Sequence, residues 1–98
     1  MPRSTDQIIE ITAIRLQGGN GHKHITVVRW RSPTTSIGLA TRPRIVDWLS
    51  QRTENQAVLA DGTTQIQVAV QRRPNQPPLL RTRIDGRWTD HLLSLPRL

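Results

Sequence analysis

The chain contains no cysteine, no tyrosine and no phenylalanine among its 98 residues. The lack of cysteine excludes disulfides, thiolate metal sites and cysteine nucleophiles, and it agrees with a reducing compartment. Without tyrosine and phenylalanine, the side chains that could stack on bases are three tryptophans, three histidines and the planar arginines. We therefore do not expect a platform that stacks the bases of a single strand.

Long hydrophobic runs are also missing. No apolar segment approaches the roughly 18 residues that a transmembrane helix needs, and residues 1–7 lack the apolar segment of a signal peptide. We therefore expect a cytoplasmic location and no membrane partner. The length predicts a single domain, residues 1–98, with an ordered core of about residues 8–96. A chain of this size should bury about 60–70% of its unfolded surface.

Positive charge is abundant. Thirteen arginines and Lys23 oppose seven acidic residues, which gives a net charge of +7. Such a surplus attracts polyanions, so nucleic acid is one candidate partner. A GC-rich genome that favours arginine codons would produce the same composition without selection for binding. Composition alone leaves both interpretations open.

Two strands are predicted near the N-terminus. Residues 8–16 and 25–31 are rich in β-branched side chains, and the glycine-rich segment between them predicts an antiparallel hairpin. Alternation along the second strand places Trp30 in the core, while Arg29 and Arg31 emerge on the other side. The glycine loop leads into a strand rather than a helix, so we interpret it as a hairpin loop and not as a phosphate cradle.

Two histidines follow the glycine loop. His22 and His24 would lie on one side of a strand, where a third ligand such as His91 or an acid could complete a transition-metal site. No fixed fourth ligand is evident, and Lys23 sits between the two imidazoles. We therefore expect no metal and no cofactor.

One helix is predicted in the middle of the chain. Residues 32–40 are expected to form a loop, after which Thr41 supplies a capping hydroxyl and Pro43 suits the first helical turn. Apolar side chains then recur at three- and four-residue spacing, giving a face that can cover the sheet. Arg42 and Arg44 at the start of the helix oppose its macrodipole, a mismatch that an anionic partner would relieve.

A second hairpin is predicted over residues 57–72, with its turn at Asp61-Gly62. Apolar and glutamine side chains alternate in its long arm, which indicates one buried face and one wet face. Three prolines within residues 72–78 predict a stiff surface loop before the C-terminal strands.

The C-terminal segment is the least generic part of the sequence. Asp85-Gly86 tolerates positive φ at both central positions of a tight turn, so residues 79–84 and 87–89 are predicted to form a hairpin. Asp90 would suit the cap of a helical turn that Pro96 ends. The tail should dock on the body, because each buried leucine stabilises by roughly 1.5–3 kcal/mol. Its leucines are Leu92, Leu93, Leu95 and Leu98.

Together these elements predict an α+β fold in the order ββαβββ plus an apolar C-terminal tail. The antiparallel sheet should have about five strands, with one helix packed on one face. The other face is expected to be partly open, and arginines on the strands could gather there into a basic stripe. The stripe would contain Arg15, Arg29, Arg31, Arg81 and Arg83, and these residues together with Arg87 are the candidate nucleic-acid-binding residues.

Three patterns carry a family resemblance. They are Ile11-Thr12-x-Ile14-Arg15-Leu16, His22-x-His24-Ile25-Thr26-x-Val28-x-Trp30 and Leu80-x-Thr82-x-x-Asp85-Gly86-x-x-x-Asp90-x-Leu92-Leu93-x-Leu95-Pro96. On these patterns the chain, from about Ile8 to Pro96, resembles the domain-of-unknown-function family 3892. That family is similar to small proteins encoded by bacteria and their phages, which implies a bacterial cytoplasm.

The resemblance implies no activity, because none is established for that family. Its pattern more often has asparagine where this chain has His91. This departure weakens any argument that gives position 91 a fixed catalytic or metal-binding role.

The patterns support two binding hypotheses. The first is a small, basic, non-enzymatic module of bacterial or phage origin that binds nucleic acid through contacts between arginine and phosphate. The alternative is a module that binds a host or partner protein, because arginine and tryptophan also anchor protein interfaces. It would act as a monomer or as a homodimer formed through the sheet edge or the leucine tail. A contiguous positive face would favour nucleic acid, and scattered arginines beside an apolar patch would favour protein.

An enzyme is the hypothesis with least support, and we expect none. Asp85 and Asp90 could be paired carboxylates, but one precedes glycine in a turn and the other suits a cap. Ser94, His91 and Asp90 are close in sequence without any context that would activate the hydroxyl.

Overall fold

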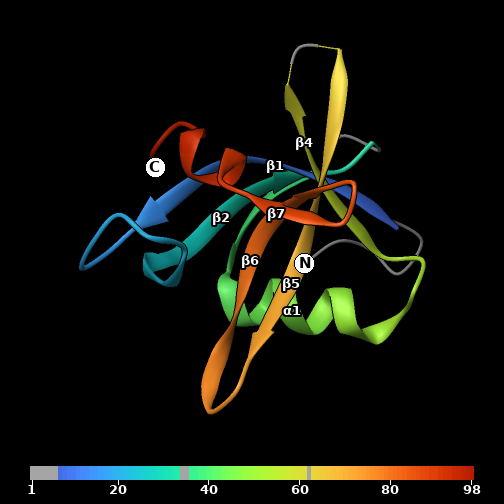
Figure 1. The fold of residues 1–98 in the computed structure, drawn as a ribbon. Helices are drawn as coiled ribbons and strands as arrows, with labels where there is room; N and C mark the ends of the chain where they lie inside the picture. The colour runs from blue at the N-terminus through green and yellow to red at the C-terminus, as the bar shows by residue number, and fades with distance from the viewer. Residues whose placement is uncertain (1–6, 34–35, 62) are drawn as a thin grey trace.

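The structure is a computed structural model that describes residues 7–33, 36–61 and 63–98. Within these ranges, seven strands form one sheet in the order β3-β2-β1-β4-β5-β6-β7, with one α-helix, α1, on one side of the curved sheet (Figure 1). The strands are β1 (Ile8–Leu16), β2 (Ile25–Arg31), β3 (Ile37–Thr41), β4 (Gln56–Asp61), β5 (Thr64–Arg73), β6 (Gln76–Ile84) and β7 (Arg87–Thr89). Helix α1 is Arg42–Gln51, and two 3-10 turns, η1 and η2, are His22–His24 and His91–Ser94.

The predicted α+β class is confirmed, but the sheet is larger than predicted and is mixed. It has seven strands rather than about five, and β1 and β4 run parallel over Ile8–Glu10, whereas all other neighbours among the described strands are antiparallel. The parallel pair arises because α1 carries the chain back from β3 before β4 begins. Parallel neighbours need such a crossover.

Two predicted loops are wrong. The segment 32–40 contains β3, which pairs regularly with β2 from Ile37 to Thr41. The proline-rich segment is mostly strand, since β5 runs to Arg73 and β6 begins at Gln76. Its two prolines at residues 77–78 lie where the β5–β6 ladder shifts register, and proline is tolerated at such a bulge because no ladder donor is needed there.

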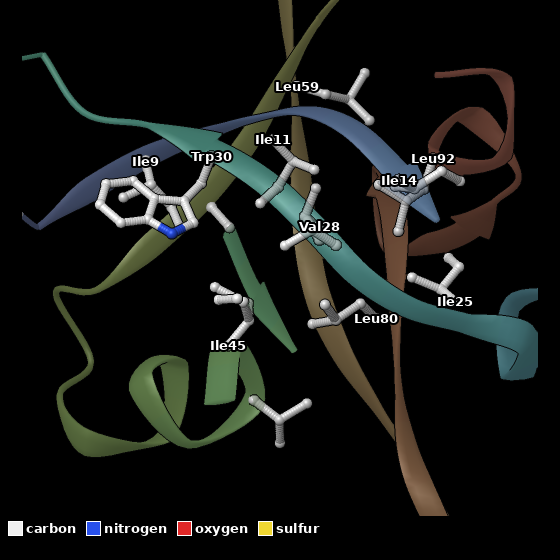
Figure 2. Packing of buried hydrophobic residues seen from close by; sticks show 14 of the residues in the cluster. Ile9, Ile11, Ile14, Ile25, Val28, Trp30, Ile45, Leu59, Leu80 and Leu92 are labelled. Carbon is white, nitrogen blue, oxygen red and sulfur yellow. The ribbon is translucent and has the colours of Figure 1, made fainter. Parts of the chain in front are cut away.

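The core lies between the inner face of the sheet and α1 (Figure 2). Trp30 is 3% exposed, which confirms its predicted place in the core. The predicted helix face is also confirmed. Its buried residues are Ile45, Val46 and Trp48.

The C-terminal tail docks on the body, as predicted. Leu92 is fully buried, Leu93 and Leu95 pack partly buried against the core, and Leu98 remains 36% exposed. The Ile14 amide donates to the Pro96 carbonyl at 3.0 Å, and the Leu98 amide donates to the Ile14 carbonyl at 2.8 Å. The C-terminus therefore lies beside the end of β1 (Figure 1), and the tail ties the β7 side of the sheet back to its middle.

Candidate functional site

One row of side chains crosses the outer face of the sheet, the face turned away from α1. Residues that stand directly opposite each other on neighbouring strands share a face, so the row can be followed through the strand pairing from β3 to β7. In that order it consists of Ile37, Arg31, Glu10, Val58, Gln67, Arg83 and Trp88. Two of the candidate arginines therefore lie near opposite ends of one row.

The six candidate arginines fall into two groups. The β2 strand and the β6 strand are separated by β1, β4 and β5. Four strand spacings of about 4.8 Å place the two groups about 19 Å apart along the sheet. The group on β1 and β2 is Arg15, Arg29 and Arg31, and the group on β6 and β7 is Arg81, Arg83 and Arg87.

The β3 end of the row is apolar and open. Ile37 is 70% exposed and Leu39 is 60% exposed. A groove of about 530 Å³ runs from Ile37 past Arg31 and Glu10 towards β4 and β5. A second hollow, of about 460 Å³, is lined by Arg29, Ile37, Gly38, Leu39 and Leu98. The two exposed side chains of β3 thus stand between hollows that carry arginine on their walls.

Acids already neutralise two of the candidate arginines. The Arg31 guanidinium lies 3.0 Å from the Glu10 carboxylate, and the Arg81 guanidinium lies 2.9 Å from the Asp90 carboxylate. Arg81 also donates to the Thr89 carbonyl at 3.3 Å. Such a side chain is held by the fold rather than presented to a ligand.

The β7 end of the row carries an arginine stacked on a tryptophan. The Arg83 guanidinium lies 5.2 Å from the centre of the Trp88 ring, within the range of a cation–π contact. Arg87 is exposed at the start of β7. These two arginines are the ones at this end that no acid holds within the described chain.

A cluster of polar side chains joins β6 and β7 to η1 and η2. The Thr82 hydroxyl is fully buried, donates to the Thr89 carbonyl at 3.0 Å and lies 2.6 Å from the Thr89 hydroxyl. The Thr89 hydroxyl in turn lies 2.9 Å from His91 Nδ1. These groups satisfy one another, so the cluster fastens β7 and η2 to β6.

His22 reaches the same cluster from η1. Its side chain is 11% exposed, and its Nε2 lies 3.8 Å from the Asp90 carboxylate without a hydrogen bond to any described residue. Burial lowers the pKa of His22, and the charge of Arg81 lowers that pKa further, while the charge of Asp90 raises it. Asp90 occupies the predicted cap position of η2, but its side chain makes no capping bond and pairs with Arg81 instead.

The three histidines have separate partners. Nδ1 of His24 accepts from the Gly21 amide at 3.0 Å, which turns its ring into the glycine loop, whereas His91 binds Thr89. Over the residues that the structure places, no group of three His, Asp or Glu side chains could hold a metal ion. The expected independence from metal remains a prediction.

A comparison with known protein families assigns the chain. The model described as Protein of unknown function (DUF3892) matches residues 10–96. The chain belongs to this family. The resemblance drawn from the three sequence patterns is thereby confirmed. No curated protein and no solved structure matches the chain.

In this DUF3892 chain, pattern residues that lie far apart in sequence meet in the polar cluster. His22 comes from the second pattern, and Thr82 and Asp90 come from the third. The hydrogen bond from Thr82 to Thr89 and the ion pair between Arg81 and Asp90 run between β6 and the segment that follows it, so these contacts hold the tail in place. The described part of the chain has no helix that is both long enough and apolar enough to cross a membrane.

Sequence reasoning missed the exposed side chains of β3. Ile37 and Leu39 alternate with Gly38 and Ala40, which is a strand pattern, but the segment is short and small residues fill its inner face. Alternation of large apolar with small side chains was the signal available. This alternation identifies an edge strand only when it is also known that the segment pairs with β2.

Proposed function

We propose that this chain is a non-enzymatic module that binds a partner protein through the β3 end of its outer face. The observation that carries the proposal is the exposure of Ile37 and Leu39, 70% and 60%, next to two arginine-lined hollows. Large exposed apolar side chains that lie together on a surface are typical of interaction sites. Arginine beside them adds the residue type that anchors many interfaces.

The division of the arginines supports a protein partner over nucleic acid. Phosphate contacts along a strand or duplex need several free cations on one surface. Here the two groups lie about 19 Å apart along the sheet, and Arg31 and Arg81 are paired with acids. A partner that contacts the apolar side chains of Ile37 and Leu39 does not have to break an ion pair to do so.

A non-enzymatic role is supported by the polar cluster. Its hydroxyl groups bond to each other, and Thr82 is inaccessible to a substrate. A catalytic nucleophile needs a free hydroxyl or thiol beside a base.

Site-specific photocrosslinking tests the protein-binding proposal. A benzophenone side chain placed at position 39 should capture a discrete protein from nuclease-treated lysate of the source cell. The same group at Gln67, which is exposed in the middle of the row, is the matched control and should capture little. Equal capture at both positions, or none at position 39, would contradict the proposal.

Nucleic acid is the second candidate, because Arg83 stacks on Trp88 and Arg87, which pairs with Ile84, is exposed at the same end of the sheet in a chain of net charge +7. If about four phosphates are neutralised, log K against log salt should fall with a slope of about −3 to −4 on duplex DNA. Arg83→Ala with Arg87→Ala should flatten that slope by about two contacts. Failure to bind at about 50 mM salt would remove this candidate.

The pair Arg29→Ala and Arg31→Ala serves as the comparison from the other end of the row. Both side chains are exposed, so neither change should move the melting temperature much. If this pair flattens the slope by about two contacts as well, both ends contact the same nucleic acid.

A further inference from the structure

The β3 strand has one free edge. It pairs with β2 on one side, and no backbone hydrogen bond reaches it on the other side from the placed residues. Unpaired amide and carbonyl groups at such an edge are a template for another strand. Proteins usually guard these edges with charged side chains, proline or a bulge. The sequence of β3 is Ile-Gly-Leu-Ala-Thr, and β3 pairs with β2 in unbroken register. It therefore has no charged side chain, no proline and no bulge.

The side chains of β3 differ between its two faces. Ile37 and Leu39 point to the outer face, where they are largely exposed. Gly38 and Ala40 point inward, and a Cβ at Gly38 would lie 2.7 Å from the Trp30 ring. A strand added at this edge would therefore find apolar contacts on the outer face and only small side chains on the inner face.

Positive charge surrounds this edge. Arg29 stands opposite Leu39, and Arg31 stands opposite Ile37. Beyond the end of β3, the first turn of α1 contains Arg42 and Arg44 and no acidic residue. Glu10 is the acid that pairs with this group, and it pairs with Arg31 alone. The local excess of positive charge favours an acidic occupant and disfavours a second copy of this chain, which would bring the same arginines.

From these observations we propose that the free edge of β3 accepts an extended acidic segment of a partner protein as an eighth strand. This inference rests on the proposed protein-binding function and names its mode. Alternate apolar side chains of the segment contact Ile37 and Leu39 on the outer face. The carboxylates between them point to the inner face, the side on which α1 begins with Arg42 and Arg44. Main-chain hydrogen bonds supply affinity in this mode, and the alternate side chains supply specificity.

The test uses a fluorescent peptide of about seven residues, enough to pair along β3 with one residue to spare at each end. Valine occupies alternate positions and glutamate the others, and binding to the full chain is followed by fluorescence anisotropy. Leu39→Lys should weaken binding at least about tenfold, and the matched charge change Gln67→Lys should not. A peptide with lysine in place of glutamate should fail to bind.

Methylation of the peptide backbone tests strand addition itself. In a strand, alternate amides point to opposite edges, so one alternate set of N-methyl groups would block pairing with β3 and the other set would face solvent. One methylated peptide should lose binding and the other should keep it. If both bind, or if neither binds, the added strand is wrong.

Failure of the inference can be told from failure of the proposed function. If position 39 still crosslinks to a protein while backbone methylation has no selective effect, the module binds protein by another mode. If sedimentation shows a dimer of the unliganded chain that Leu39→Lys dissolves, the occupant is a second copy and the acidic segment is overturned. Displacement of the peptide by duplex DNA alone would likewise assign the edge to nucleic acid.

Discussion

The two edges of the sheet differ in length, charge and cover. β3 is five residues long, carries no charge and leaves Ile37 and Leu39 exposed. β7 is three residues long, begins with Arg87 and has Arg83 stacked over its tryptophan. Directly after β7 the chain turns through η2 and bonds to β1 at Ile14. The β7 end, called the covered edge below, is thus tied back to β1 by the chain's own tail, whereas no described residue pairs with the outer edge of β3.

This difference separates structural residues from candidate binding residues. The polar cluster at the covered edge contains His22, Thr82 and Asp90, three of the polar residues of the family patterns. Thr82 and Asp90 bond to other residues of the chain, and His22 packs 3.8 Å from Asp90. At the open edge the exposed residues are apolar and belong to no pattern that sequence analysis singled out. A shared pattern in a small domain therefore need not lie on its binding surface, because a tail that closes the fold also requires specific residues.

The largest expected effect comes from deleting the C-terminal tail. Deletion of residues 90–98 removes the fully buried Leu92, the partly buried Leu93 and Leu95, and both hydrogen bonds to Ile14. Buried leucine at roughly 1.5–3 kcal/mol each approaches the whole stability of a small domain. We expect the shortened chain to lose its cooperative thermal transition by circular dichroism. A sharp transition in that chain would show that the tail is peripheral.

The same residue type can be compared at both edges. Leu92→Ala should cost about 2–5 kcal/mol, because it removes buried methyl groups and leaves a cavity. Leu39→Ala, at a side chain that is 60% exposed, should change stability by less than about 0.5 kcal/mol. Urea unfolding of the two variants measures both values. Similar costs at the two positions would remove the distinction between the edges.

Strands and turns with strong local signals could be predicted from the sequence. The turn at Asp85-Gly86 has φ of 50° and 79° at its two residues, as the dipeptide indicated. The helix begins after Thr41 as predicted, with Pro43 in its first turn, although the Thr41 hydroxyl makes no capping hydrogen bond. The burial of Trp30 follows from alternation. Each of these features depends on residues close together in the chain.

The remaining features depend on neighbours that are distant in sequence. Alternation places Arg81 and Arg83 on one face of β6, but it does not say that Asp90 will pair with Arg81. It also does not say that three strands separate β6 from β2, which decides whether the arginines gather. The prolines at residues 77–78 were misassigned because the register shift that accommodates them involves β5.

Glycines near the two edges provide a smaller contrast. Gly38→Ala brings a Cβ within 2.7 Å of the buried Trp30 ring, and such overpacking should cost about 1–3 kcal/mol. Gly86→Ala meets no atom within 4 Å, so its cost is that of a φ of 79° alone, about 1 kcal/mol. Tryptophan fluorescence should shift for the first variant and not for the second. If Gly86→Ala loses more stability than Gly38→Ala, the Trp30 ring moves aside at little cost in free energy.

The smallest expected effect concerns pH at the covered edge. Burial, followed by the charge of Arg81, lowers the pKa of His22 below its usual 6.5 in the folded chain. Between that lowered value and 6.5, the unfolded chain binds more protons than the folded one, so stability is present at neutral pH and falls as the pH drops below about 6.5. Melting temperatures measured from pH 7.5 to pH 5.5 should therefore decline less in His22→Gln than in the parent chain.

The variant Asp90→Asn tests the role of His22 in this pH dependence. It should change the slope of melting temperature against pH, whereas a general loss of stability would lower the melting temperature at every pH. The charge of Asp90 raises the pKa of His22 and also neutralises Arg81. Without that charge, the pKa of His22 should fall further, so the decline of melting temperature with acid should steepen even though Asp90 is largely exposed. Leu39→Lys, at the open edge, should leave the slope unchanged. If Asp90→Asn flattens the slope instead, the carboxylate rather than His22 governs the pH response of this edge.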